Sequence, residues 1–366
     1  MSVGATAAGT RAYRDALSGL PAEHFRTLDG LVVSSIGLGT YLGEEDDATD
    51  RSYEAAIVEA VALGANLLDT AINYRAQRSE RALGAALGRL AASGTASREQ
   101  LVVCTKAGYL PFDGYTPIDP AAYFRDTYVR PGILAPADIV AGCHAMTPRF
   151  LADQLARSRR NLGVEHLDVV YLHNPETQLA AIAREEFRAR LRAAFVQLEA
   201  EVAAGRVGRY GVATWHGLRR PPSARDHLAL AELVAAAREA GGAGHHFRVV
   251  QLPYNLAMPE AYTDATQVVD GTLVPVLEAA ARFGLAVVAS ASILQGQLSV
   301  RLPRAVDAAL PGLDTPAQRA LQFVRSTPGV TAALVGMGRP EHVRENLRVA
   351  RLPPAPAGVD SLLGRR

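Results

Sequence analysis

The sequence predicts an α/β protein that folds as a (β/α)8 TIM barrel, with an N-terminal β-hairpin and a long loop after the third barrel strand. Short runs rich in valine, leucine and alanine alternate with longer stretches of helical apolar spacing, which is typical of repeated βα units around a parallel sheet. Eight such runs are present, and this number matches a closed barrel. An open, doubly wound sheet usually has fewer strands and an early G-x-G-x-x-G turn, and the sequence has no such turn.

The strand candidates begin at Ile36 and are separated by segments long enough to hold a helix. They are residues 36–40, 66–70, 101–105, 167–172, 208–213, 247–252, 285–290 and 330–335. Ahead of them, residues 25–34 are expected to form a hairpin with its turn at Asp29-Gly30, closing the bottom of the barrel. Residues 1–24 show no clear periodicity, so we treat them as an N-terminal extension of a barrel domain that spans residues 25–366.

Two connections are much longer than the usual βα loop of about 2–6 residues. They are residues 107–147 and 291–313, and each follows the carboxyl end of a strand, where the active sites of TIM barrels lie. The first connection is rich in tyrosine and phenylalanine. We expect these rings to form an apolar wall or lid over the active site, and the alternative is an oligomer contact or a surface flap.

Composition favours small-molecule chemistry in the cytoplasm. Lys and Arg total 38 against 37 Asp and Glu, so no basic field indicates binding to nucleic acid or to a membrane surface. No apolar run is long enough to span a bilayer, and Cys104 and Cys143 are too few for a disulfide framework. No histidine has a cysteine or carboxylate partner at metal-ligand spacing, so we expect no metal site. An oligomer is compatible with all of this.

Four polar side chains are expected to meet at one mouth of the barrel. Asp69, Lys106 and His173 stand at the ends of three successive strand candidates, and Tyr74 follows Asp69 closely. Each of them alone is more often a helix cap, a solvated charge or a packed ring. Together they suit acid catalysis: Lys106, held by Asp69, is expected to lower the pKa of Tyr74 from about 10 towards working pH, and His173 to orient a substrate carbonyl.

The segment from Asn66 to Tyr74, with Ser79-Glu80 and Leu83-Gly84 after it, resembles the N-x-x-D-T-A-x-x-Y…S-E-x-x-L-G signature of the aldo-keto reductase family. The likeness extends from about residue 25 to residue 350. It implies an NAD(P)(H)-dependent oxidoreductase that transfers hydride between a nicotinamide cofactor and an aldehyde or ketone, or the corresponding alcohol. It also implies a catalytic tetrad of Asp69, Tyr74, Lys106 and His173.

The resemblance further implies substrate contacts and leaves alternatives for the function. The substrate-side residues are Tyr41, Tyr109, His173 and Trp215. The substrate would be a small carbonyl compound or a sugar, because a sugar or aldose dehydrogenase of the same family remains an alternative. An alternative of another class is a regulatory subunit that binds the cofactor without significant turnover.

The cofactor positions are carried over from the same resemblance. Gln251 matches the glutamine that binds the nicotinamide carboxamide, Thr214 stands where relatives have an amide partner, and Ser290 replaces a tyrosine that often stacks on the nicotinamide. The full implied set is Gly39, Thr40, Asp69, Thr214, Gln251, Ser290, Gln295, Gly336, Met337, Gly338, Arg339, His342, Glu345 and Asn346.

The segment 336–346 resembles the part of the family that binds the adenosine phosphate. Small residues followed by a helix start suit an anion. Arg339 is the strong cation available for a ribose 2′-phosphate, so NADP(H) is favoured over NAD(H). Against this, Gly336 and His342 stand where many NADP-preferring members have Lys and Arg.

Overall fold

The computed structural model describes residues 4–364 and contains a closed barrel of eight parallel strands. Around the barrel the order is β3, β4, β5, β6, β7, β8, β11 and β12, and β12 pairs with β3 to close the ring. The bounds are β3 Ile36–Gly39, β4 Leu67–Asp69, β5 Val102–Ala107, β6 Leu167–His173, β7 Val207–Ala213, β8 Phe247–Pro253, β11 Ala286–Ser290 and β12 Ala332–Gly336. The predicted fold class is therefore confirmed, and each strand lies within two residues of its candidate.

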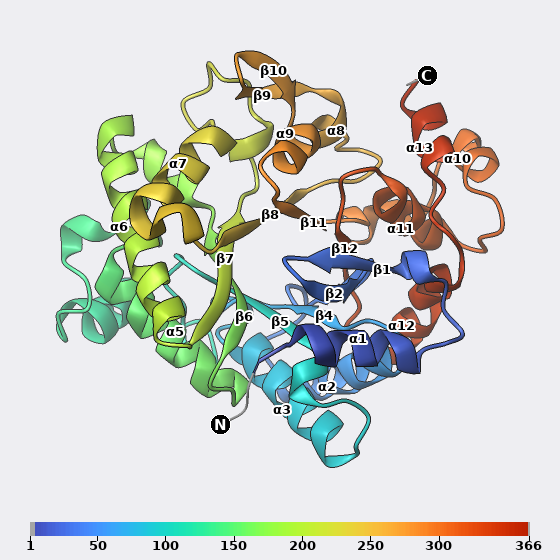
Figure 1. Cartoon of the computed structure of the whole chain (residues 1–366). Helices are drawn as coiled ribbons and strands as arrows, with labels where there is room; N and C mark the ends of the chain where they lie inside the picture. The colour runs from blue at the N-terminus through green and yellow to red at the C-terminus, as the bar shows by residue number, and fades with distance from the viewer. Residues whose placement is uncertain (1–3, 365–366) are drawn as a thin grey trace.

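Helices surround the strands, as Figure 1 shows, with α2 and α3 at the bottom of the view, α5 to α7 on the left and α11 and α12 on the right. Their bounds are α2 Asp47–Ala62, α3 Arg78–Ala92, α5 Pro148–Leu162, α6 Arg184–Ala203, α7 Leu230–Gly241, α9 Val276–Arg282, α11 Pro316–Ser326 and α12 Pro340–Asn346. Local signals set several ends: Asp46 caps α2, Thr315 and Gln318 form a capping box at α11, and α5 stops at Gly163, which has φ 65°.

The smaller elements lie at the ends and in the connections. They are α1 Ala7–Ala16, α4 Pro120–Phe124, α8 Glu260–Thr263, α10 Arg304–Ala309, α13 Pro356–Leu362 and the strands β9 Ala265–Val269 and β10 Thr272–Pro275. Strands β9 and β10 pair as a separate two-stranded sheet between β8 and α9.

The predicted N-terminal hairpin is present as β1 Phe25–Leu28 and β2 Leu31–Ser34. Its turn has Asp29 at φ 44° and Gly30 at φ 81°, the positive values that a tight hairpin turn requires. Leu28, Leu31 and Val33 are buried in one cluster with inward-facing side chains of the barrel strands. The hairpin therefore closes one end of the barrel, and the catalytic candidates lie at the other.

Residues 7–16 form a helix that the sequence did not predict. Thr6 caps α1 by accepting a hydrogen bond from the Gly9 N–H. The helix packs against β2, and the hydroxyl of Tyr13 donates to the Val61 carbonyl at 2.5 Å. Gly9 and Thr10 are weak helix formers, so contacts with the barrel must supply much of the stability of this helix.

The expectation that the aromatic residues of 107–147 form a wall over the active site is wrong for most of them. Phe112 and Phe124 stack with their ring centroids 5.0 Å apart, and Tyr128 is fully buried beside Phe150 of α5. These rings form a small core of their own with the aliphatic side chains of the same loop. They pack inward because a loop of this length must bury its own apolar surface to hold one conformation.

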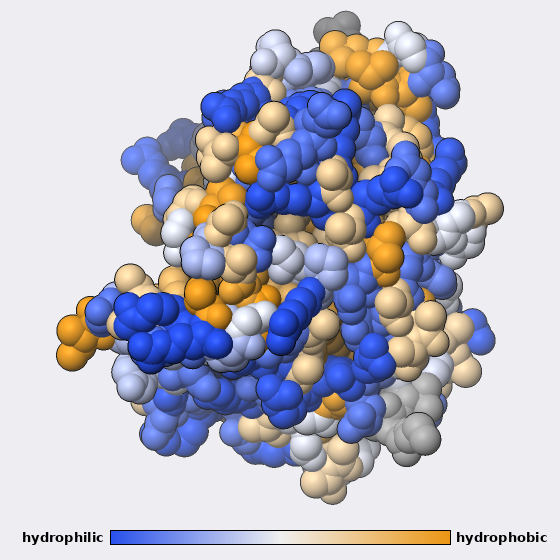
Figure 2. All heavy atoms as spheres, turned by 90° about the vertical axis from the view of Figure 1, so that its left-hand side faces the viewer, coloured by the Kyte–Doolittle hydropathy of each residue, from blue (hydrophilic) through white to orange (hydrophobic). Residues whose placement is uncertain are grey.

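The outer surface mixes hydrophilic residues with small, separate groups of apolar ones on the face that Figure 2 shows, which is the left side of Figure 1. None of the helices within residues 4–364 is long and apolar enough to cross a membrane. Over the same residues, no group of three or more His, Cys, Asp or Glu side chains is arranged to hold a metal ion.

Candidate active site

The structure brings Asp69, Tyr74, Lys106 and His173 together at the carboxyl ends of β4, β5 and β6. Lys106 Nζ donates to Asp69 Oδ1 at 2.5 Å and to the Thr70 carbonyl at 2.9 Å. The same nitrogen lies 4.7 Å from the centre of the Tyr74 ring. The Tyr74 ring meets the His173 ring edge-on, with the centroids 5.9 Å apart. A carboxylate, an ammonium and a phenol therefore lie next to one another in that order, and an imidazole lies beside the phenol.

The pKa of Tyr74 differs from the expectation. Burial raises it above the usual value of 10, and the attraction of the nearby Lys106 ammonium offsets only part of this increase. The phenol is thus protonated at neutral pH, contrary to the expected shift of its pKa towards working pH. A protonated phenol next to an ammonium is the state from which a proton can be donated.

Lys106 and His173 have opposite charge states at neutral pH. Burial alone lowers the pKa of Lys106, but Asp69 and Tyr74 outweigh burial and raise it, so the side chain stays an ammonium. Burial lowers the pKa of His173 well below 6.5, and the positive charge of Lys106 adds to the effect. The imidazole is therefore neutral, with one N–H and one acceptor nitrogen.

A cavity of about 1280 Å³ opens at this end of the barrel. Its volume exceeds the 300–1,000 Å³ or so that is usual for one small ligand, so it has room for a dinucleotide as well as a substrate. It is lined by Gly39, Thr40, Tyr41, Asp69, Tyr74, Tyr109, His173, Thr214, Trp215, Gln251, Ser290, Gln295, Gly336, Gly338, Arg339, His342, Glu345 and Asn346.

Two of the site residues expected from the sequence do not line this cavity. Lys106 is 1% exposed and lies behind Tyr74 and Asp69, which it contacts without reaching the cavity. Met337 is fully buried in the main apolar core and does not face the cavity.

Hydrogen bonds within the protein already occupy two of the expected cofactor residues. Gln251 Nε2 donates to Asp69 Oδ2 at 2.8 Å. The Thr214 hydroxyl donates to Glu176 Oε1 at 2.5 Å and accepts from the Gly217 N–H at 2.8 Å. Thr214 therefore has at most one acceptor position left for a ligand.

Aromatic rings line the part of the cavity next to Tyr74 and His173. Tyr41 meets Tyr74 edge-on at 5.0 Å, and Tyr109 meets His173 edge-on at 5.0 Å. Trp215 also lines the cavity and is 36% exposed. A second cavity of about 560 Å³ adjoins the first and shares Tyr109, Asn174 and Trp215 with it. Of the long loop 107–147, Tyr109 is the residue that lines either cavity within the described chain.

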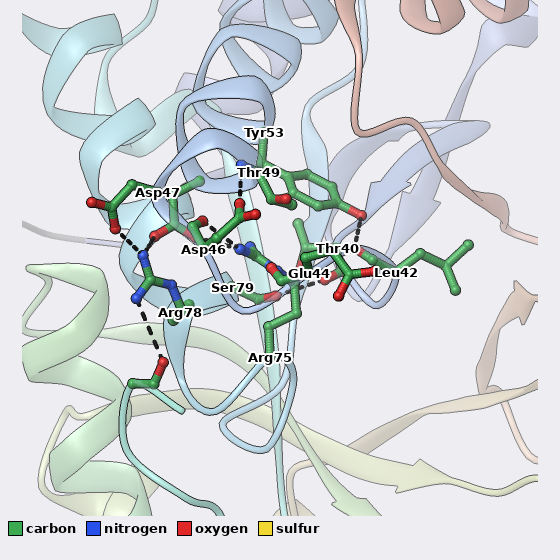
Figure 3. A network of polar contacts seen from close by, with 12 residues as sticks. Thr40, Leu42, Glu44, Asp46, Asp47, Thr49, Tyr53, Arg75, Arg78 and Ser79 are labelled. Atoms are coloured by element: carbon green, nitrogen blue, oxygen red, sulfur yellow. Dashed lines mark hydrogen bonds and ion pairs between the residues drawn. The ribbon is translucent and has the colours of Figure 1, made fainter. Parts of the chain in front are cut away.

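The loop between β3 and α2 forms another wall of the cavity through Tyr41, Leu42, Gly43 and Glu44. Figure 3 shows the side chains that hold this loop by its backbone. Ser79 donates to the carbonyl of Thr40, Tyr53 to that of Leu42, and Arg75 to those of Glu44 and Asp46. Alternate carbonyl groups are thus anchored from outside the loop, which leaves the loop preformed.

Arg75, Ala76 and Gln77 follow Tyr74 and all have left-handed backbone conformations, with φ of 50°, 51° and 69°. Such values cost about 1–3 kcal/mol each in residues other than glycine and persist where contacts enforce them. Arg75 bonds Asp50 at 2.5 Å as well as the loop carbonyls, and Gln77 donates to the Phe112 carbonyl at 2.7 Å. The strained turn is therefore tied to both neighbouring loops.

A model of the Aldo/keto reductase family matches residues 35–357. The chain belongs to the aldo-keto reductase family. Among solved structures, an aldo/keto reductase from Klebsiella pneumoniae in complex with NADP and acetate has a TM-score of 0.62 at 21% identity, over 94% of this chain and 96% of that one. The holo form of an aldo-keto reductase from Bacillus halodurans has a TM-score of 0.61 at 17% identity, over 92% and 95%.

These identities are low, so the solved structures show a shared fold. A comparison with curated proteins finds no match. The family model covers both long connections and all eight barrel strands, because it runs from just before β3 into the C-terminal helix α13. The resemblance read from the signature around Tyr74 is therefore confirmed.

The end of the cavity formed by residues 336–346 contains groups that would fit the adenosine part of a nicotinamide dinucleotide. Asn346 lines the cavity, and its Oδ1 is buried with no hydrogen-bond partner among residues 4–364. Such an atom suits a donor such as an amino group of a ligand. Arg339 is exposed at the rim and forms no ion pair within the described chain, whereas Arg344 of the same helix pairs with Glu59 and Glu341.

Sequence reasoning missed part of the cavity wall. Thr49, Ser52 and Tyr53 come from α2, and Ser52 donates to the Gly338 carbonyl at 2.6 Å. A helix on the outside of the barrel gave no sign of facing the site. The available signal was the position of residues 41–46 after the first strand, at the same end as the tetrad.

Proposed function

We propose that this aldo-keto reductase reduces a small aldehyde or ketone with NADPH, with Tyr74 as the proton donor. Its family makes it an NAD(P)(H)-dependent oxidoreductase. The observation that carries the assigned roles is the position of Lys106 Nζ, bonded to Asp69 on one side and near the Tyr74 ring on the other. This complete set favours an enzyme over a regulatory subunit that binds the cofactor without turnover.

The proposed reduction adds a hydride to the carbonyl carbon and a proton to the carbonyl oxygen. The reduced nicotinamide supplies the hydride when it is bound. Tyr74 gives up the phenol proton, and the Lys106 ammonium stabilises the phenolate that remains. Asp69 holds Lys106 in place, and the neutral His173 donates a hydrogen bond to the substrate oxygen. The reverse direction, oxidation of an alcohol, uses the same groups.

Three features support the choice of cofactor and substrate. The unpaired Arg339 at the rim favours NADP(H) over NAD(H) by binding the 2′-phosphate. The Klebsiella pneumoniae relative was solved with NADP. On the substrate side, Tyr41, Tyr109 and Trp215 suit a flat or ring-shaped molecule, which includes aryl aldehydes and sugars.

The free thiols of Cys104 and Cys143 fit a cytoplasmic location, and an oligomer remains compatible with the proposal.

The test is steady-state turnover of 4-nitrobenzaldehyde and 9,10-phenanthrenequinone with NADPH, for the wild type and Tyr74→Phe. The variant keeps the ring and removes the proton donor, so kcat should fall by roughly 10²-fold or more while the cofactor Kd stays unchanged. Wild-type turnover in the variant would show that Tyr74 is not the acid. Tight cofactor binding with no turnover of any carbonyl by the wild type would favour the regulatory subunit.

A further inference from the structure

His144 of the long loop lies behind the candidate site and does not line either cavity. It is fully buried, and its Nε2 lies 2.8 Å from the carbonyl oxygen of His173. Its Nδ1 lies 2.8 Å from Nε2 of Gln178. The ring therefore spans from the 3-10 turn after β6, Pro175–Ala180, to the last residue of β6.

The protons in this chain of contacts can be assigned. Arg190 Nη1 bonds Gln178 Oε1 at 2.8 Å, and a guanidinium only donates. This fixes the oxygen of the Gln178 amide towards Arg190, so its NH₂ group donates to Nδ1 of His144. Nδ1 is then an acceptor and the ring proton is on Nε2, which donates to the His173 carbonyl. Burial lowers the pKa of His144 to about 4, in agreement with a neutral ring.

The backbone around this contact is built to allow it. Gly108 has φ 138°, and a Cβ at this position would lie 2.9 Å from His144 Nε2 and 3.1 Å from the His173 carbonyl oxygen. A side chain at residue 108 would therefore strike both partners of the hydrogen bond. The next residue, Tyr109, packs edge-on against the rings of His144 at 5.1 Å and His173 at 5.0 Å.

His173 lacks other hydrogen bonds that would fix its orientation through Nδ1. That atom is buried and has no partner anywhere in residues 4–364. The ring is instead confined by its contacts with Tyr74 and Tyr109 and by the position of its own peptide. His144 contacts two of the groups that confine the His173 ring, namely the peptide carbonyl of His173 and the ring of Tyr109.

We propose that His144 is a positioning residue for the reduction, which holds the His173 peptide and the Tyr109 wall so that the His173 imidazole faces the substrate oxygen. The proposal deepens the proposed function and rests on it. A series of hydrogen bonds thereby connects the outer helix α6 to the substrate side of the site, through Arg190, Gln178 and His144. The two hydrogen bonds of the His144 ring should affect the reduction differently. The Nε2 bond reaches the His173 peptide, and the Nδ1 bond reaches only Gln178.

Two substitutions separate these bonds. In His144→Gln the amide nitrogen takes roughly the place of Nε2, so donation to the His173 carbonyl is retained and the contact with Gln178 is lost. In His144→Asn the amide oxygen takes roughly the place of Nδ1, so the contact with Gln178 is retained and donation to His173 is lost. Each variant loses one buried hydrogen bond, so a purely structural role predicts similar effects in both.

We expect His144→Asn to lower kcat for 4-nitrobenzaldehyde about 10-fold, and His144→Gln to stay within about threefold of the wild type, with NADPH Kd unchanged in both. The ring ¹⁵N resonances of His173 should move in His144→Asn and stay in place in His144→Gln. The matched control is His24→Asn, because His24 is also fully buried and bonds the Gly64 carbonyl at 2.9 Å, but at the closed end of the barrel. It should lower stability and leave kcat unchanged.

Equal losses of kcat in the two His144 variants, or wild-type kcat in His144→Asn, would overturn the proposal. If His144→Asn does not fold, Gly108→Ala displaces Nε2 of His144 from the His173 carbonyl without altering His144, because its Cβ would lie 2.9 Å from that nitrogen. A lower kcat with unchanged NADPH Kd then supports the proposal, and wild-type kcat refutes it. The NMR measurement needs no turnover, so it tests the positioning even if Tyr74→Phe shows that the proposed acid is wrong.

Discussion

The charges beneath Tyr74 are buried as a pair, and neither member is stable alone. Asp69 and Lys106 are 3% and 1% exposed, and their mutual contact offsets the cost of removing both from water. Burial raises the pKa of Asp69, and Lys106 and Gln251 offset only part of this increase. The pair therefore supplies a fixed positive charge next to the phenol, at a cost in stability that depends on both partners being present.

The first residue-scale prediction follows from this pairing. Lys106→Met should lower the free energy of unfolding by about 3–5 kcal/mol, because it leaves the Asp69 carboxylate buried without its partner. The double variant Asp69→Asn with Lys106→Met should be more stable than Lys106→Met alone, although it remains inactive. Urea unfolding of the wild type, both single variants and the double variant measures this coupling. Additive losses would show that the two groups do not form a pair.

Arg339 provides the second residue-scale prediction. Arg339→Ala should weaken NADPH binding by about 1.5–3 kcal/mol, the range for a hydrogen bond to a charged group, and leave NADH binding nearly unchanged. The matched control is Arg344→Ala on the same helix, since Arg344 is already paired with Glu59 and Glu341. Fluorescence titration with both cofactors decides the matter. Equal weakening of NADH and NADPH, or an initial preference for NADH, would refute the assignment.

At the scale of elements, the anchored loop between β3 and α2 is the wall whose shape depends most clearly on neighbouring segments. Its carbonyl groups are held by side chains from α2, from the turn after Tyr74 and from the first turn of α3 (Figure 3). Arg75 contributes two of these bonds from a left-handed backbone conformation. Anchoring and strain are thus combined in one residue, and substitutions can separate them.

Arg75→Ala and Arg75→Gly both remove the anchor, but only glycine relieves the strain at φ 50°. We therefore expect Arg75→Gly to be more stable than Arg75→Ala by about 1 kcal/mol, while both weaken NADPH binding to a similar degree. Thermal unfolding and cofactor titration give the two readouts. Equal stability of the variants would mean that the left-handed conformation costs little, and unchanged cofactor affinity would mean that the loop holds its shape without Arg75.

At the scale of the whole molecule, buried histidines make stability depend on pH. Burial lowers the pKa of both His24 and His144 from 6.5 to about 4. In this window the unfolded chain binds more protons than the folded one, so stability rises with pH. The contribution is complete above pH 6.5 and is lost as pH falls towards 4. A shift of this size corresponds to about 3 kcal/mol per group as an upper bound.

Other buried groups also make the free energy of unfolding depend on pH. Burial raises the pKa values of Asp69 and Glu80, so these carboxyl groups change stability with pH in the opposite direction to the histidines. We therefore compare the wild type with a variant that lacks one histidine. The free energy of unfolding of the wild type should fall from pH 6.5 to pH 4 more steeply than that of His24→Asn, which lacks one of these histidines. Urea unfolding at several pH values provides the slopes. Parallel slopes for the two proteins would show that His24 is not protonated preferentially in the unfolded chain.

The sequence predicted the barrel and the tetrad because both depend on short-range patterns. Each strand is an apolar run with turn residues around it, and the carboxyl end of every strand lies on the same side of a parallel barrel. The order of residues alone therefore indicates that Asp69, Lys106 and His173 lie together. The charge state of Tyr74 was not predictable in this way, because it depends on how much burial opposes the attraction of Lys106.

The sequence did not predict the features that depend on tertiary contacts. Helix α1 depends on its packing against β2, the rings of Phe112 and Phe124 face each other and not the site, and Met337 lies in the core. Aromatic content in a rim loop does not show which way the rings point. The partners of His144 are also far apart in sequence, so its spacing gave no indication of its contact with His173.

The hairpin that closes the far end of the barrel affects the route by which a proton can reach Tyr74. The side chains that the hairpin contributes to this end, Leu28, Leu31 and Val33, are aliphatic and cannot relay a proton. In the proposed reduction we therefore expect the phenolate of Tyr74 to be reprotonated from the open mouth. A bound ligand that fills the mouth also separates this oxygen from bulk water, so exchange of its hydrogen with solvent becomes a measure of how long the site stays covered.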